Sequence, residues 1–155
     1  MEAAGKNRII KILATGGGAG LSPVAPGTAG TLVGVLICLL CYSMPWPIRL
    51  LCVIAISVFS IYVAGQAETL YEKTDDQRIV IDEIAGLQVT MLPVAITGLH
   101  LCLAFVLFRI FDIWKPFPLD HFQKFPGGWG VVADDLGAGV YAGLILFLLT
   151  MAGVL

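Results

Sequence analysis

Charged residues are scarce in this chain of 155 residues: they make up 13% of it, against roughly 25% in soluble domains. Hydrophobic residues account for 58%, and the mean hydropathy is +0.92. The net charge of −2 argues against a basic surface, so we expect no nucleic-acid partner. The composition predicts one membrane-embedded domain over residues 1–155, with a core that largely faces lipid.

Several signatures of phosphate-handling enzymes are also absent. No cysteine is followed six positions later by arginine, which excludes a cysteine phosphatase, and the Pro-Ser-Gly-His of histidine lipid phosphatases is missing. The DxDx(T/V) of haloacid-dehalogenase enzymes is missing too, and the glycine-rich stretch 15–20 lacks the Gly-Lys-Ser/Thr of a P-loop. No internal repeat is evident, although many transporters have one. In a phosphate-handling enzyme without these signatures, carboxylates and a metal ion would be the remaining reactive groups.

What the chain does have is a segregated charge pattern. Apart from Arg49, every charged residue lies in one of three polar segments, 2–11, 68–83 and 109–135, and apolar stretches separate them. Stretches of this kind are candidates for membrane-embedded helices. We therefore expect an all-α integral membrane protein, a small helical bundle with about four to five membrane-embedded helices. The last span is predicted at 136–155, and the three polar segments face the cytoplasm, as the positive-inside rule expects.

Two further segments need interpretation. The stretch 84–108 could cross the membrane once, or turn back at Pro93–Gly98 as a helical hairpin of 82–92 and 99–114. The charge distribution favours the hairpin, because it keeps all acids on one side. The segment 15–31 is too glycine-rich for a stable helix. We expect a Gly-rich N-terminal loop at the cytoplasmic surface that lines the same cavity as the acids.

Two acidic pairs are the main candidates for chemistry. Asp82 and Glu83 open an apolar helix, where they either complement the helix dipole or hold a divalent cation such as Mg²⁺, with Gly86 one turn on to admit a ligand. Asp134 and Asp135 precede the last predicted span. Asp135 could be its N-cap, but capping needs no second acid. Acids gathered at one face of a membrane indicate a metal site there.

Basic residues accompany these acids. Arg109, Asp112 and Lys115 recur every three residues, roughly along one helix face. The basic side chains either snorkel at a membrane edge with Asp112 as their partner, or form a phosphate clamp from the Arg fork and the Lys point charge. Backbone N–H groups of the glycine loop at 16–20 could also cradle phosphate.

Taken in order, these segments resemble the phosphatidylglycerophosphatase A family. The matching blocks are 13–18, 26–31, 79–86, 108–116 and 130–135. The resemblance implies a hydrolase of phospholipid biosynthesis, which removes the terminal phosphomonoester of phosphatidylglycerol phosphate with Mg²⁺ as cofactor. It also implies a multi-pass protein of the bacterial cytoplasmic (inner) membrane, with a phospholipid substrate and an active site that faces the cytoplasm.

The charge pattern and the family resemblance together give the expected site residues. The catalytic residues are expected to be acidic: Asp82, Glu83, Asp112, Asp134 and Asp135. The expected metal ligands are Asp82, Glu83, Asp134 and Asp135, and the expected phosphate-binding residues are Arg109, Lys115, Gly17, Gly18 and Thr28. Asp134 or Asp135 would be nucleophile or base, and the sequence leaves open whether water attacks directly or an aspartyl-phosphate forms.

Two other functional classes compete with the phosphatase. A small cation channel or transporter would explain intramembrane carboxylates. It would not explain Arg109 and Lys115 beside them, because cations next to a cation pathway repel its cargo. A structural membrane subunit leaves the acidic pairs without a role. The phosphatase is therefore the leading hypothesis.

Overall fold

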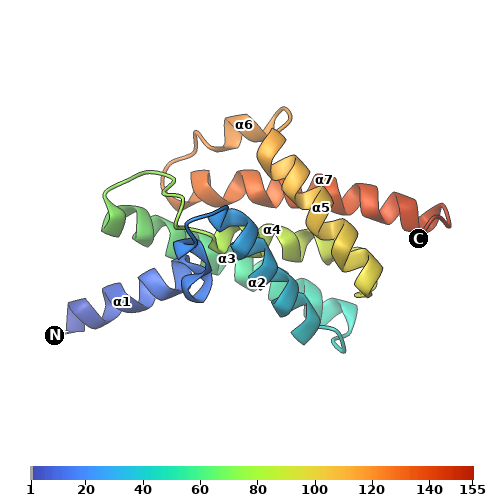
Figure 1. The fold of residues 1–155 in the computed structure, drawn as a ribbon, viewed down its shortest axis with the longest axis horizontal. Coiled ribbons are helices and arrows are strands. Elements are labelled where there is room, and N and C mark those ends of the chain that lie inside the picture. The colour runs from blue at the N-terminus through green and yellow to red at the C-terminus, as the bar shows by residue number, and fades with distance from the viewer. Residues whose placement is uncertain (1) are drawn as a thin grey trace.

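The structure is a computed structural model that describes residues 2–155, and in this part of the chain it contains helices and no strands (Figure 1). The elements are α1 (Glu2–Ala14), the 3₁₀ helix η1 (Gly16–Leu21), α2 (Pro26–Leu40), α3 (Trp46–Tyr71), α4 (Ile81–Met91), α5 (Gly98–Trp114), α6 (Leu119–Phe122) and α7 (Gly128–Met151). The all-helical prediction is confirmed.

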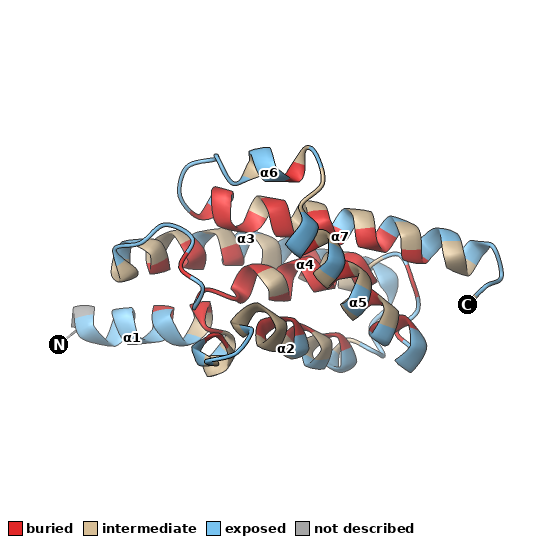
Figure 2. Ribbon diagram, turned by 45° about the horizontal axis from the view of Figure 1, so that its top comes forward, coloured by how far each residue is buried: buried red, intermediate tan, exposed pale blue. Residues whose placement is uncertain are grey.

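The short helix α4 is the centre of the bundle. Nine of its 11 residues are buried, and it packs against α2, α3, α5 and α7. Figure 2 shows the buried residues gathered on α4 and on the N-terminal half of α7, while α1 is largely exposed. A Cβ at Gly139 would lie 2.4 Å from the Gly86 carbonyl oxygen, so the backbones of α4 and α7 are in direct contact.

The helical hairpin is confirmed to within about a residue at each end. Its arms are α4 and α5, and residues 92–97 make the turn. Arg49, near the start of α3, donates through its guanidinium to the carbonyl oxygens of Met91 and Val94, and Trp46 Nε1 donates to the Leu92 oxygen at 3.2 Å. A cation on the last carbonyls of a helix satisfies groups that have no partner within it. Arg49, the charged residue outside the three polar segments, thus stabilises the hairpin turn between α4 and α5.

The glycine-rich segment differs from the expected loop. Residues 16–21 form the distorted 3₁₀ helix η1, with left-handed φ values of 72° at Gly17 and 106° at Gly18, and residues 22–25 are irregular. From Pro26 onward the chain is the helix α2, with proline in the first turn, where its missing N–H costs nothing. Gly30 packs against Val80, the residue just before α4, because a Cβ at Gly30 would lie 2.5 Å from Val80 Cβ. Close packing here outweighs the low helix propensity of glycine.

The last helix starts at Gly128, eight residues before the predicted start of the span. Asp134 and Asp135 therefore lie in its second turn, and the N-cap interpretation of Asp135 is wrong. The reason lies in the contact with α3: a Cβ at Gly128 would be 1.9 Å from the Ile61 oxygen. Glycine at this position lets the first turn of α7 form against the α3 backbone.

Two of the described helices, α3 and α7, are long and apolar enough to cross a membrane, which is fewer than the four to five membrane-embedded helices expected. The apolar helix α2 has 15 residues. The 11 residues of α4 rise only about 16 Å, half of a roughly 30 Å hydrocarbon core. Large apolar side chains nevertheless cover the outer surface of α3, including Leu51, Ile54 and Val58.

Gly139→Ala is predicted to destabilise the bundle, because its methyl group would meet the Gly86 oxygen and push α7 away from α4. We expect a cost of about 1–3 kcal/mol, typical of overpacking, seen as a lower Tm of the detergent-solubilised protein. Gly5→Ala is the matched control: Gly5 lies in α1, and a Cβ at this position would have nothing within 4 Å. Its Tm should stay equal or rise, since alanine favours a helix. Equal losses in both variants would contradict the close contact.

Candidate active site

The predicted site residues meet in one cavity, at the end of the bundle opposite the hairpin turn. Its volume is about 640 Å³. The start of α4, the end of α5, the second turn of α7 and the first residues of α2 enclose it. Six acidic and two basic side chains line it: Asp75, Asp82, Glu83, Asp112, Asp134, Asp135, Arg109 and Lys115. All five expected catalytic acids are among them, and so are both basic residues expected to bind phosphate.

Three of the acids form a compact group. Asp82 and Glu83 come from the first turn of α4 and Asp135 comes from α7, and one carboxylate oxygen of each lies within 4.8 Å of the others. The exposed fraction is 6% for Asp82 and 3% for Asp135. Negative charges this close repel each other strongly where water is largely excluded.

The hydrogen bonding of this group fits a cation. Asp82 Oδ1, Glu83 Oε2 and Asp135 Oδ2 are buried without a hydrogen-bond partner among the described residues. Buried polar atoms are normally paired, so several orphaned oxygens in one place indicate a missing positive partner. Carboxylate oxygens are the ligands of hard cations such as Mg²⁺. The donor set of Asp82, Glu83 and Asp135 therefore fits such an ion.

Asp134 differs from the other expected metal ligands. Its Oδ2 is paired with Lys115 Nζ, and it is not part of the group of three. Its Oδ1 is buried and has no hydrogen-bond partner in the described part of the chain. Asp134 thus joins α7 to the C-terminal end of α5, one residue away from Asp135 of the acidic group.

Arg109 connects the two arms of the hairpin. Its Nη1 pairs with Asp112 on the same helix and lies 3.8 Å from Glu83 Oε1 on α4. Its side chain is 17% exposed, and its Nε is buried without a partner in the described structure. A snorkelling arginine would instead reach a membrane edge. Arg109 is directed into the cavity, so its charge acts on whatever the cavity holds.

Gly27 is a site residue that sequence reasoning missed. A Cβ on Gly27 would lie 2.2 Å from Glu83 Oε1 and 3.0 Å from Arg109 Nη1, so only glycine leaves room for this ion pair. Thr28 is half-buried and does not line the cavity. The signal for Gly27 was present in block 26–31. The sequence could not tell which residue of the block faces the acids, because the segment was expected to be a loop.

Gly17 and Gly18 do not line the acidic cavity, although Pro23, Ala25, Pro26 and Gly27 of the same glycine-rich segment do. The expectation that segment 15–31 shares a cavity with the acids is therefore confirmed for residues 23–27 and wrong for Gly17 and Gly18. Gly16 packs on Ile84 and Val80, and a Cβ at Gly20 would lie 2.2 Å from the Arg78 oxygen. The loop therefore covers the other side of the α3–α4 connection. There Gly17 and Gly18 line a second cavity.

Comparisons with known proteins agree on one family. A family model described as phosphatidylglycerophosphatase A matches residues 12–150. A relative of that name from Escherichia coli K12 is 36% identical over 138 residues, which is 88% of this chain and 80% of the relative. A Haemophilus influenzae protein of the same name is 33% identical, over 89% of this chain and 86% of its own length.

A third relative has a different name. It is a protein of Bacteroides thetaiotaomicron, provisionally named as a phosphatidylinositol-3-phosphatase, and it is 35% identical over 87% of this chain and 89% of its own length. No solved structure matches the chain.

Gly27→Ala is predicted to lower kcat/KM for phosphate release from a lipid phosphomonoester by roughly tenfold to a hundredfold, because its methyl group displaces Glu83 and Arg109 by about an ångström. Both are flexible side-chain ends, so the Tm should change little. Thr28→Ala is the matched control on the next residue, and kcat/KM should stay within about twofold. If Thr28→Ala were instead the damaging change, the sequence assignment of Thr28 would be right and the role of Gly27 wrong.

Proposed function

Because the chain belongs to the phosphatidylglycerophosphatase A family and is thus a phosphatase, we propose that it hydrolyses the terminal phosphomonoester of phosphatidylglycerol phosphate with Mg²⁺ as its cofactor. The products would be phosphatidylglycerol and phosphate, a step of phospholipid biosynthesis. The observation that carries the proposal is the pairing of a three-carboxylate group with two basic side chains in one cavity. A metal ion and the two basic side chains would together balance the negative charge that the carboxylates and the phosphate bring to this cavity.

The cofactor would be held by Asp82, Glu83 and Asp135, whose unpaired oxygens form the acidic group. When bound, Mg²⁺ supplies charge neutralisation for the phosphate oxygens and for the leaving alkoxide. Gly27 leaves room for Glu83 and Arg109 to lie side by side, so a ligand carboxylate and the phosphate-binding guanidinium would meet at the same place. The carboxylates alone would repel the substrate.

Arg109 and Lys115 would bind the phosphate itself. Asp112 fixes the Arg109 guanidinium by an ion pair, so the fork is oriented before the substrate arrives. Lys115 is held by Asp134 in the same way. Charge that develops on the equatorial oxygens in the transition state would be stabilised by these preoriented cations. Asp112 thus acts through Arg109.

We assign Asp134 as the proton acceptor for the attacking water. Its Oδ2 is occupied by Lys115, but its Oδ1 is buried without a partner in the described structure and its carboxylate lines the cavity. Asp135 is the neighbouring residue in the acidic group, so the metal site and the base belong to one turn of α7. The alternative is direct attack by an aspartate, which would form an aspartyl-phosphate.

The site is proposed to face the cytoplasm from within the bacterial inner membrane. α3 and α7 would cross the bilayer, and α2, α4 and α5 would be embedded beside them as a multi-pass bundle. The apolar outer surface of α3 supports this arrangement, because such a surface is costly in water. Arg49 lies at the opposite end, and the other Lys and Arg residues of the sequence belong to the polar segments, as the positive-inside rule requires.

The Bacteroides relative suggests a second candidate substrate. Phosphatidylinositol 3-phosphate is also a glycerophospholipid with a phosphomonoester on its head group, so the same metal and cations would serve. A cation channel, the other alternative, is disfavoured by Arg109 and Lys115 among the acids. Comparing kcat/KM for the two lipids on the purified protein distinguishes the two substrates.

Removal of one carboxylate is predicted to abolish the response to Mg²⁺ without loss of folding. In EDTA, Asp135→Asn should be at least as stable as the wild type, because it removes one of three mutually repelling charges. With Mg²⁺ at about 100 times its Kd, the wild type should gain roughly 2.7 kcal/mol and the variant nothing. Asp120→Asn, at an exposed acid on α6, is the matched control and should keep the full gain.

The measurements are thermal unfolding and phosphate release, each with Mg²⁺ and with EDTA. EDTA should stop phosphate release by the wild type. If Asp135→Asn kept both its Mg²⁺-dependent rise in Tm and near wild-type turnover, the proposed ligand set would be wrong.

Arg109→Lys tests the phosphate fork. A lysine keeps the charge but loses the planar guanidinium, so kcat/KM should fall by about tenfold or more, equivalent to about 1.4 kcal/mol of transition-state stabilisation. Lys115→Arg should be milder, because a point charge is more easily replaced. The Mg²⁺-induced rise in Tm should be unchanged in Arg109→Lys. Unchanged steady-state kinetics would show that Arg109 has only a structural role.

A further inference from the structure

A second cavity, of about 720 Å³, lies between α1, η1 and the α3–α4 connection. Three cationic side chains line it, Arg8, Lys11 and Arg78, and no acidic residue is among its lining residues in the described part of the chain. The two left-handed glycines, Gly17 and Gly18, belong to the same lining. The catalytic cavity, in contrast, is rich in acids. The second cavity therefore suits a ligand of negative charge.

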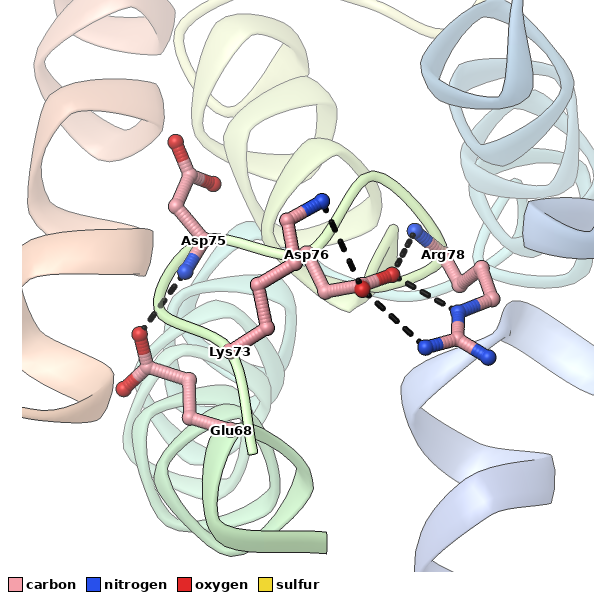
Figure 3. A network of polar contacts seen from close by, with 5 residues as sticks. All are labelled: Glu68, Lys73, Asp75, Asp76 and Arg78. Atoms are coloured by element: carbon pink, nitrogen blue, oxygen red, sulfur yellow. Dashed lines mark hydrogen bonds and ion pairs between the residues drawn. The ribbon is translucent and has the colours of Figure 1, made fainter. Parts of the chain in front are cut away.

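Arg78 is held in a fixed position in this cavity. Its Nε and Nη2 donate to the two Asp76 oxygens at 2.7 and 3.0 Å, and its guanidinium carbon lies 3.9 Å from the centre of the Tyr71 ring. Figure 3 shows Asp76 between Arg78 and Lys73, with Arg78 turned toward the pale blue ribbon of α1. These hydrogen bonds lower the pKa of Asp76 to about 2, so the carboxylate stays charged and keeps its hold on Arg78.

The other two cations come from one face of α1. Arg8 and Lys11 are three residues apart, and the Lys11 ammonium lies 5.5 Å from the Tyr71 ring centre. No carboxylate among the described side chains pairs with either of them. Exposed apolar residues of the same region, Ile9 and Ile12, accompany these charges. A helix that combines basic and exposed apolar residues is typical of a membrane surface with anionic lipids.

An apolar cavity adjoins the basic one. It has about 450 Å³, lies between α2, α3 and the start of α4, and shares Ile12 and Gly17 with the basic cavity. Its other lining residues are mostly large and apolar, among them Val33, Ile37 and Phe59. A cationic cavity that continues into an apolar one matches the two parts of a phospholipid, a phosphate head group and an acyl chain.

The two cavities of opposite charge are separate. They share no lining residue, although the α3–α4 connection borders both. Asp75, Gln77 and Ile79 face the catalytic cavity, while Arg78 faces the basic one. A lipid in the basic cavity would therefore not compete directly for the acidic group.

We propose that the basic cavity and the adjoining apolar cavity form a binding site for an intact anionic glycerophospholipid of the surrounding bilayer. The phosphate contacts Arg8, Lys11 and Arg78, and one acyl chain occupies the cavity between α2 and α3. A zwitterionic head group binds less well, because its ammonium meets three cations. Inorganic phosphate binds less well too, because it leaves the apolar cavity empty.

The test is the thermal shift of the purified, detergent-solubilised protein, titrated with short-chain phosphatidylglycerol, phosphatidylcholine of the same chain length, or inorganic phosphate. The wild type should be stabilised by phosphatidylglycerol at concentrations at least about tenfold lower than by the other two. In Arg8→Gln and in Lys11→Gln the apparent Kd for phosphatidylglycerol should rise about fivefold each, the usual contribution of a basic residue to binding anionic lipid.

Three variants complete the design. Lys6→Gln removes a charge from the same helix outside the cavity lining, and its Kd should match the wild type within about twofold. Ile37→Trp fills the apolar cavity and should weaken phosphatidylglycerol binding by about tenfold while leaving inorganic phosphate unaffected. Arg109→Lys changes the catalytic cavity and should leave the phosphatidylglycerol-induced thermal shift intact. The lipid-binding result is therefore independent of whether the proposed phosphatase reaction is correct.

The outcomes are distinct. Equal protection by inorganic phosphate and by phosphatidylglycerol would replace the lipid with a free anion and overturn the proposal. Equal losses in Lys6→Gln and Arg8→Gln would mean a diffuse charge effect in place of a site. Loss of the shift only in Arg109→Lys would assign the lipid to the catalytic cavity.

Discussion

The backbones of α4 and α7 touch at Gly86 and Gly139, and the arrangement of the candidate active site depends on this contact. A Cβ at Gly86 would lie 2.7 Å from the backbone carbonyl oxygen of Asp135. The backbone at Asp135 is therefore packed directly on α4, the helix that carries Asp82 and Glu83. Side chains at these glycines would push the two helices apart and move Asp135 away from Asp82 and Glu83.

Holding these acids together has a cost in stability. Several of their oxygens are buried without partners, and unpaired buried polar groups destabilise a fold unless something else satisfies them. The surrounding structure offsets part of the charge through Arg109 and Lys115, each of which is itself paired with an acid. The negative charge that remains is what a divalent cation would neutralise. A cation at Asp82, Glu83 and Asp135 would thus both stabilise the fold and serve the proposed reaction.

The connection between α3 and α4 separates two environments of opposite charge. On one side it borders the acidic cavity of the proposed reaction, and on the other the basic cavity beside α1. Asp76 stabilises this connection through Arg78 and Lys73, while Glu68 accepts a hydrogen bond from the Asp75 amide at 2.9 Å. The opposite charges are thereby kept apart, and each remains available to a ligand.

The sequence by itself determined the elements whose signals are local. Pro93 and Gly98 interrupt a long apolar stretch, so the hairpin could be predicted almost to the residue, and the acids next to apolar runs are those that line the acidic cavity. Family blocks supplied the reaction class. Only the tertiary structure decided which residues of each block meet. Helix propensity is local, whereas α2 and α7 begin at Pro26 and Gly128 because distant backbones pack on their glycines. That packing directs Gly27 to the acids, turns Gly17 toward the basic cavity, and pairs Asp134 with Lys115.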